Sequence, residues 1–113
     1  MEDKQIAMQL MEIKAKLPTY YSKGNAFEMK ARFDSYKCII RNLPDRYSST
    51  AIFTASEFWD IELDINWAIK GTPQKEAESR FFEARRHLED DINHVLNQLS
   101  NVTQAYRGEG GDQ

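Results

Sequence analysis

The sequence predicts an all-α fold: an antiparallel bundle of about four helices with a long C-terminal helix. Apolar residues recur at steps of three and four along most of the chain, which is the spacing of one face of an α-helix. Prolines and glycines cluster at three places (Pro18 with Gly24, Pro44, and Gly71 with Pro73) and divide the chain into four segments. The one stretch that fits a strand equally well, residues 48–53, has no second strand to pair with.

The length and composition predict a single domain. The chain has 113 residues, of which 41% are hydrophobic and 29% charged, and these proportions are typical of a folded globular domain. We expect residues 1–107 to form one helical-bundle domain. The glycine-rich residues 108–113 are expected to form a flexible C-terminal tail.

The first two segments are expected to form amphipathic helices. Residues 2–17 form the first helix, which Pro18 ends. The second begins at Asn25, where Glu28 completes a capping box, and ends at Leu43 before Pro44. The apolar stripes are Ile6, Leu10, Ile13 and Leu17 in the first helix, and Ala26, Met29, Phe33, Tyr36, Ile40 and Leu43 in the second.

The third segment is expected to begin with a capping box formed by Thr54 and Glu57 and to end at Gly71. Residues 48–53 before it are expected to be helix or loop. The fourth begins with Thr72 as N-cap and Pro73 as the first helical residue. Its apolar stripe comprises Ala77, Phe81, Ala84, Leu88, Ile92, Val95, Leu99, Val102 and Tyr106.

The fourth helix is about twice as long as the others, roughly 50 Å against roughly 25 Å. This mismatch leaves three arrangements open. The long helix spans two shorter helices laid end to end, or its far end extends past the bundle and pairs with a second copy of the chain. The third arrangement is a break within the helix, which no proline or glycine marks.

The third helix has two apolar faces instead of the usual single stripe. Phe58, Ile61, Ile65, Ala68 and Ile69 share one arc. Trp59, Leu63 and Trp67 share a second arc, and tryptophan is enriched at the energetically important positions of protein interfaces. Either this second arc packs inside the monomer or it binds a partner. We predict a partner-binding surface formed by Trp59, Leu63, Trp67, Val102 and Tyr106.

One flank of the fourth helix is a candidate metal site. Its members are Glu83, His87, Asp90, Asp91 and His94, mostly at helical spacings. Metal sites in helical bundles take ligands from at least two helices, for example as Glu-x-x-His motifs. Here the order is Asp91-x-x-His94 and no matching motif occurs elsewhere, so we predict a solvated polar flank and no metal site.

A second candidate is the acidic face of the third helix, Glu57, Asp60 and Asp64. The Glu57-x-x-Asp60 pair resembles the Glu-x-x-Glu motif with which all-α nucleotide pyrophosphohydrolases of the MazG type hold Mg²⁺. The resemblance implies a metal-dependent nucleotide hydrolase. The companion acidic pair is absent from the preceding helix, which is basic instead. The hydrolase is therefore an alternative, and the simpler interpretation is charge complementarity between the two helices.

Single-stranded nucleic-acid binding is a further alternative. Lys23, Lys30, Lys37 and Arg41 lie along the second helix, and Tyr20, Tyr21 and Tyr36 could stack on bases. The net charge of −3 and the pI near 5.4 argue against a protein whose main task is to bind phosphates.

We therefore predict a non-enzymatic protein that acts through protein–protein contacts, as a regulator, adaptor or inhibitor, and that self-associates. No catalytic residue and no cofactor is expected. No apolar run approaches the roughly 20 residues of a membrane span, and the first ten residues lack signal-peptide features. The single Cys38, which lies in an apolar stretch and is expected to be buried, forms no internal disulfide. A cytoplasmic location without membrane contact is expected.

Overall fold

The computed structural model of the chain describes residues 2–99, and these residues form helices without any strand. The elements are α1 (Asp3–Ala15), α2 (Lys23–Arg41), the short 3₁₀ helix η1 (Asp45–Tyr47), α3 (Ser48–Ala55), α4 (Phe58–Lys70) and α5 (Gln74–Gln98). The predicted all-α class is confirmed, with five α-helices where about four were expected. No helix within residues 2–99 has the length and apolar character needed to cross a membrane.

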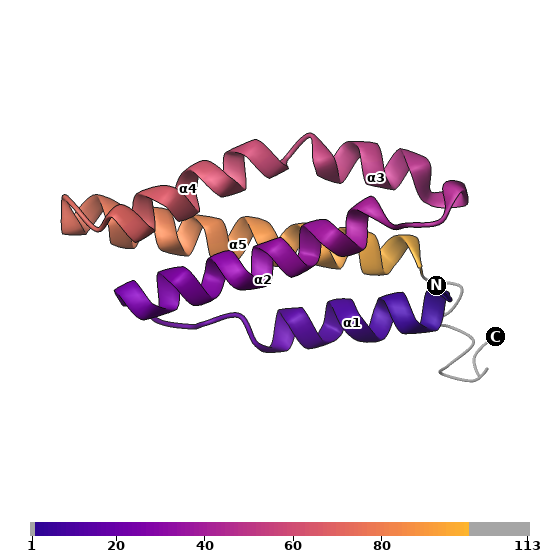
Figure 1. The fold of residues 1–113 in the computed structure, drawn as a ribbon, viewed down its shortest axis with the longest axis horizontal. Helices are drawn as coiled ribbons and strands as arrows, with labels where there is room; N and C mark the ends of the chain where they lie inside the picture. Colours follow the sequence, from indigo (N-terminus) through magenta and orange to yellow (C-terminus); the bar gives the residue numbers. More distant parts are fainter. Residues whose placement is uncertain (1, 100–113) are drawn as a thin grey trace.

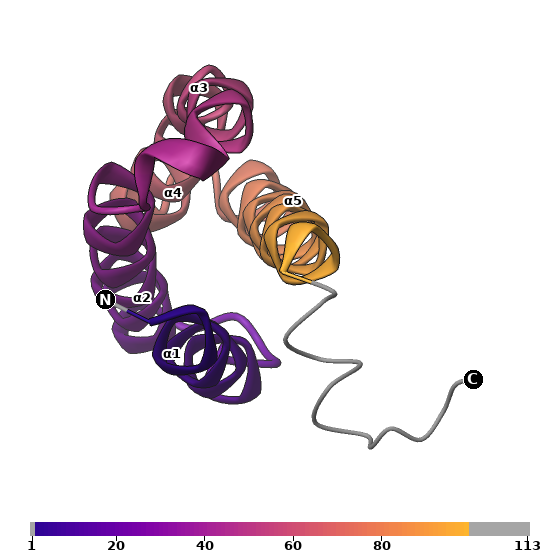
Figure 2. The ribbon, with the colours of Figure 1, turned by 90° about the vertical axis from the view of Figure 1, so that its right-hand side faces the viewer.

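The five α-helices form an antiparallel bundle with four helical positions, which we call legs (Figure 1). α3 and α4 lie end to end as one leg, and α5 runs back along it. Seen along its length, the bundle has α1 between α2 and α5, with α3 and α4 opposite α1 (Figure 2). The 25 residues of α5 span about 37 Å. The long helix therefore spans two shorter ones, as the first of the three predicted arrangements states.

The core is built from the predicted apolar stripes, because each helix turns its stripe toward the bundle axis. The fully buried large side chains are Ile6 and Leu10 of α1, Met29, Phe33, Tyr36 and Ile40 of α2, Ile61 and Ile65 of α4, Phe81, Leu88 and Ile92 of α5, and Leu99. Phe58 packs edge-on against Phe33 and Tyr36, which joins α4 to α2. The continuation of the stripe at Val102 and Tyr106, and the predicted tail 108–113, lie outside the described residues.

The predicted start of α2 at Asn25 is wrong. The helix begins at Lys23, and its N-cap is Ser22, whose hydroxyl oxygen accepts a hydrogen bond from the Asn25 amide at 3.0 Å. The Asn25 side chain instead donates to the carbonyl oxygen of Tyr20 at 2.8 Å. The helix also ends at Arg41, two residues before the predicted end, because the Asn42 side chain donates to the Cys38 carbonyl oxygen.

The cap assignment makes a testable prediction. Ser22→Ala is expected to lower the free energy of unfolding by about 1 kcal/mol, because an amide of the first turn of α2 loses its acceptor. Asn25→Ala, which removes only an exposed hydrogen bond, is expected to cost less than half of that. Urea denaturation followed by circular dichroism measures both values. A larger loss for Asn25→Ala would restore Asn25 as the cap.

The predicted capping box of Thr54 and Glu57 is also wrong. Thr54 is buried inside α3, and its hydroxyl donates back to the Thr50 carbonyl oxygen at 2.8 Å. Such a bond competes with the regular helix ladder and favours a bend. α4 begins after Glu57, whose side chain makes no cap hydrogen bond. The Glu57 carboxylate is therefore available for another contact, which lies on α5.

The predicted end of α4 at Gly71 is confirmed, whereas the predicted start of α5 with Thr72 as N-cap is wrong. Gly71 has a left-handed backbone with φ of +81°, and its amide donates to the Trp67 carbonyl oxygen at 3.1 Å. Glycine adopts this conformation without steric cost, so α4 ends there. Pro73, not Thr72, occupies the N-cap of α5, because its backbone is still extended.

Candidate functional site

Three metal-ligating side chains meet between the α3–α4 junction and α5. Glu57 comes from the junction, and His87 and Asp91 lie one turn apart on α5. One ligand atom from each lies within 4.8 Å of the others. The Nε2 of His87 is hydrogen-bonded to a Glu57 carboxylate oxygen and lies 3.8 Å from Oδ2 of Asp91. We call these three residues the polar cluster.

Asp91 is the most buried member of the polar cluster, with 6% of its surface exposed. Its Oδ2 has no hydrogen-bond partner. Burial raises the pKa of Asp91 to about 6, although the adjacent His87 acts in the opposite direction. A buried carboxylate without a full set of partners destabilises the folded state, so the position of Asp91 is unfavourable for stability.

Tyr36 adds a second unpaired polar group beside the polar cluster. The residue is wholly buried, and its hydroxyl makes no hydrogen bond. Burial and then the negative charge of Asp91 raise the pKa of Tyr36; the nearby Thr54 side chain lowers it, and Glu57 makes a smaller raising contribution. These charge effects indicate that the hydroxyl lies near both carboxylates. Two unpaired buried polar groups thus occur in one region of the core.

In the structure, the side chains of the α5 flank that the sequence suggested as a candidate metal site make separate contacts. His87 and Asp91 enter the polar cluster. Glu83 pairs with Arg86, which also contacts Asp90 at 3.1 Å. The ring of His94 lies against Phe53, with 4.9 Å between the ring centroids. The third member, Glu57, is 30 residues from His87 in the chain, so no spacing rule could have joined them.

The acidic face that resembles the MazG motif is also divided. Glu57 contacts His87, whereas Asp64 accepts a hydrogen bond from the Arg80 guanidinium at 2.8 Å. Asp60 is exposed beside a groove of about 470 Å³ between α4 and α5, which His87 also lines. The three carboxylates therefore have separate partners and do not form one cluster within residues 2–99.

The predicted second apolar face of α4 points away from the core. Trp59 is 70% exposed and Leu63 is 37% exposed, one turn apart. Trp67 is half-buried, and the cationic groups of Lys70 and Arg80 lie 4.6 Å and 5.5 Å from its ring centroid. We call Trp59, Leu63 and Trp67 the tryptophan face. The interpretation in which Trp59 packs inside the monomer is excluded.

The basic side of α2 is largely engaged by other groups. Lys37 lies 3.6 Å from Asp34 and 3.9 Å from Glu62 of α4, so part of the predicted charge complementarity between α2 and α4 is present. The Arg41 guanidinium lies over the Phe58 ring. Tyr36 is buried, and the Tyr21 hydroxyl donates to the Ala68 carbonyl oxygen at 3.0 Å. This arrangement does not favour stacking of bases along α2.

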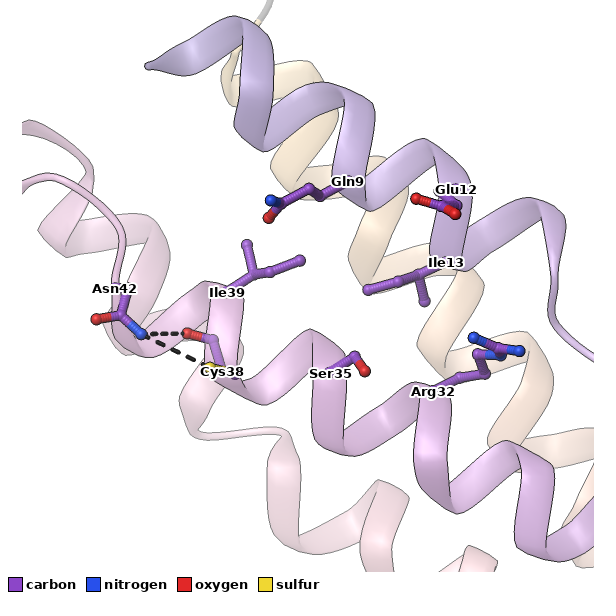
Figure 3. A pocket seen from close by; sticks show the side chains of 8 residues that line it. All are labelled: Gln9, Glu12, Ile13, Arg32, Ser35, Cys38, Ile39 and Asn42. Carbon is purple, nitrogen blue, oxygen red and sulfur yellow. Dashed lines mark hydrogen bonds between the residues drawn. The ribbon is translucent and has the colours of Figure 1, made fainter. Parts of the chain in front are cut away.

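A groove of about 500 Å³ separates α1 from α2 (Figure 3). Its lining includes Gln9, Glu12 and Ile13 of α1, and Arg32, Cys38 and Ile39 of α2. Cys38 is exposed there, so the expectation that it is buried is wrong. Cys38 is two positions after the buried Tyr36 in the chain, and a step of two positions turns a side chain about 200° around a helix, to the opposite side.

No family model matches the chain, and comparisons with curated proteins and with solved structures find no match. The residues themselves define the class. It is a four-legged helical bundle with a carboxylate–imidazole cluster inside and a tryptophan face outside.

Proposed function

We propose that the protein acts through protein–protein contacts, without enzymatic activity, and that its tryptophan face binds a second copy of the same chain. The observation that supports this most strongly is the exposure of Trp59 and Leu63 on the outside of α4. Neighbouring large apolar side chains on a surface mark interaction sites, and tryptophan contributes disproportionately to binding energy. A self-associating helical protein of this kind suits a regulator, adaptor or inhibitor.

The spacing on α4 supports a second copy as the occupant. Leu63 lies midway between Trp59 and Trp67, four residues from each. In a two-fold symmetric interface the same patch appears on both partners. An antiparallel pairing of two α4 helices centred on Leu63 therefore brings Trp59 of each chain opposite Trp67 of the other.

The charges around the tryptophan face support the same pairing. Asp60 is exposed beside Trp59, at the N-terminal end, whereas the exposed Lys70 flanks Trp67 at the C-terminal end. Antiparallel pairing brings the acidic end of one copy to the basic end of the other. Such complementarity favours this orientation over a parallel one.

The interface must extend beyond α4. A helix of 13 residues is about 20 Å long, and a stable complex buries about 800 Å² on each partner. The adjoining exposed side chains of α5, among them Glu83 and Arg86, border the groove next to Leu63 and would complete the contact area.

The mass of the protein in solution tests this proposal. At about 100 μM, sedimentation equilibrium is expected to give twice the 13.2 kDa of one chain. Leu63→Glu is expected to give the single-chain mass, because it places two like charges on the symmetry axis. The paired substitution Trp59→Ala with Trp67→Ala is expected to do the same, and circular dichroism is expected to show unchanged helicity.

Phe27→Ala is the matched control, because Phe27 is also an exposed aromatic residue but lies on α2. It is expected to leave the doubled mass unchanged. A monomeric wild-type chain at this concentration, or a dimer that persists in Leu63→Glu, would contradict the proposal. If the paired tryptophan variant loses helicity, Trp67 belongs to the core, and Leu63→Glu then decides the question.

A further inference from the structure

We propose that Glu57, His87 and Asp91 form a binding site for one divalent transition metal ion of the zinc class. This goes beyond the proposed self-association, because the polar cluster lies between the α3–α4 junction and α5 and shares no residue with the tryptophan face. A metal bound there would join the α3–α4 junction to α5.

The ligand types and their separations fit such an ion. Zinc is bound by imidazole nitrogen and carboxylate oxygen at about 2.0–2.2 Å, so ligand atoms around a tetrahedral ion lie roughly 3.4 Å apart. His87 Nε2 and Asp91 Oδ2 are 3.8 Å apart, close to that separation. Glu57 contacts His87 directly, and its carboxylate would have to move away from the imidazole to admit the ion.

Glu57 is free to make that adjustment. It lies at the junction between two helices and makes no cap hydrogen bond to either. Its side chain is partly exposed, so the movement does not require repacking of the core. His87 and Asp91, one turn apart on α5, present their groups on one side of a regular helix and need no such movement.

The unpaired polar groups point independently to a missing ligand. Asp91 is more than nine-tenths buried, and its Oδ2 faces His87 without a hydrogen-bond partner. The Tyr36 hydroxyl is wholly buried and close to the Thr54 side chain, but it has no partner with hydrogen-bonding geometry. Buried polar groups in folded proteins are nearly always satisfied, so two exceptions in one region need an explanation. A cation bound there would balance the charge of Asp91 and give its Oδ2 the partner that it lacks.

An ion also has a route from solvent. His87 lines the groove of about 470 Å³ between α4 and α5. The ligand set determines the class of metal. One imidazole with two carboxylates suits zinc and similar ions, whereas Mg²⁺ and Ca²⁺ prefer sites made only of oxygen ligands.

Metal-free protein titrated with Zn²⁺ alone tests the proposal. Calorimetry is expected to give one ion per chain. Thermal denaturation is expected to show a rise in Tm of about 10 °C at a zinc concentration one hundred times the Kd, because only the native state assembles the site. Mg²⁺ at the same concentration is expected to leave the Tm unchanged. Co²⁺ is expected to give the visible absorption bands of a tetrahedral nitrogen–oxygen site.

Single substitutions identify the ligands. Asp91→Asn and His87→Gln are each expected to weaken Zn²⁺ binding at least tenfold and to abolish the cobalt bands. His94→Gln is the matched control, because His94 is the other histidine of α5 but lies against Phe53, outside the polar cluster. It is expected to bind Zn²⁺ as the wild type does.

Three outcomes would overturn the proposal: no zinc binding by the wild type, unchanged binding in Asp91→Asn, or lost binding in His94→Gln. The paired Trp59→Ala and Trp67→Ala variant separates this proposal from the self-association. It is expected to be monomeric and to keep its zinc site, because neither tryptophan belongs to the polar cluster or lines the groove beside His87.

Discussion

Phe81→Ala is expected to lower the free energy of unfolding by about 3–5 kcal/mol, a large fraction of the stability of a domain of this size. The Phe81 side chain is fully buried in the middle of the core cluster. Its removal forfeits the transfer of a large apolar group from water and leaves a cavity that the surrounding helices fill only partly.

The loss of stability in Phe81→Ala extends beyond α5, because Phe81 also packs against the loop between α1 and α2. Its ring packs edge-on against Tyr21, with 5.5 Å between the centroids. The Tyr21 hydroxyl donates to the Ala68 carbonyl oxygen near the end of α4. Removing the Phe81 ring therefore weakens a contact that joins three parts of the bundle.

Phe82→Ala is the matched control for Phe81→Ala. Phe82 is the next residue in the chain and has the same side chain, but it is 41% exposed. Its replacement is expected to cost less, about 1.5 kcal/mol at most, because 41% of its surface already faces water in the folded protein. Urea denaturation of both variants measures the difference. Equal losses would contradict the position of Phe81 at the centre of the core.

Asp91→Asn is expected to raise the free energy of unfolding by about 2 kcal/mol near pH 8 in metal-free protein. The pKa of Asp91 in the folded protein, about 6, is higher than its value of about 3.9 in an unfolded chain. Above both values the folded state carries the cost of an ionised buried carboxylate, and asparagine removes that charge with almost no change of shape.

The sign of the pH dependence follows from the same shift in pKa. As the pH rises from about 4 to about 6, the folded wild type retains a proton on Asp91 that the unfolded chain has lost, so the stability of the wild type falls. The advantage of Asp91→Asn should therefore be absent near pH 4 and complete above about pH 7. Thermal denaturation in the presence of a chelator, at both pH values, measures it. An advantage that is equal at the two pH values would show that the charge of Asp91 is not the cause.

Some helix boundaries could be predicted from the sequence and others could not. Gly71 ends α4 as expected, because the left-handed turn depends on a single residue and its own backbone. Asn25 and Thr54 were assigned as caps, and both assignments were wrong. Each has a side chain that can cap a helix or bond a nearby carbonyl, and in the structure each bonds the carbonyl.

The tryptophan face was visible in the sequence, because the positions of Trp59 and Leu63 around a helix follow from helical geometry alone. The exposure of Trp59 and Leu63 could not be predicted from the sequence, because a second apolar face packs equally well inside a larger bundle. The partner of this face remains a prediction, as do the roles assigned to Val102 and Tyr106.

The sequence by itself determined the helical class and most residues of the core, because both depend on local spacing along the chain. Only the tertiary structure decided that α3 and α4 share one leg and that Glu57 lies against His87 and Asp91. Glu57 and His87 are 30 residues apart in the chain, and they meet because α5 runs back along α3 and α4. No periodicity records that geometry, because it arises from packing between helices and not from the order of residues within one.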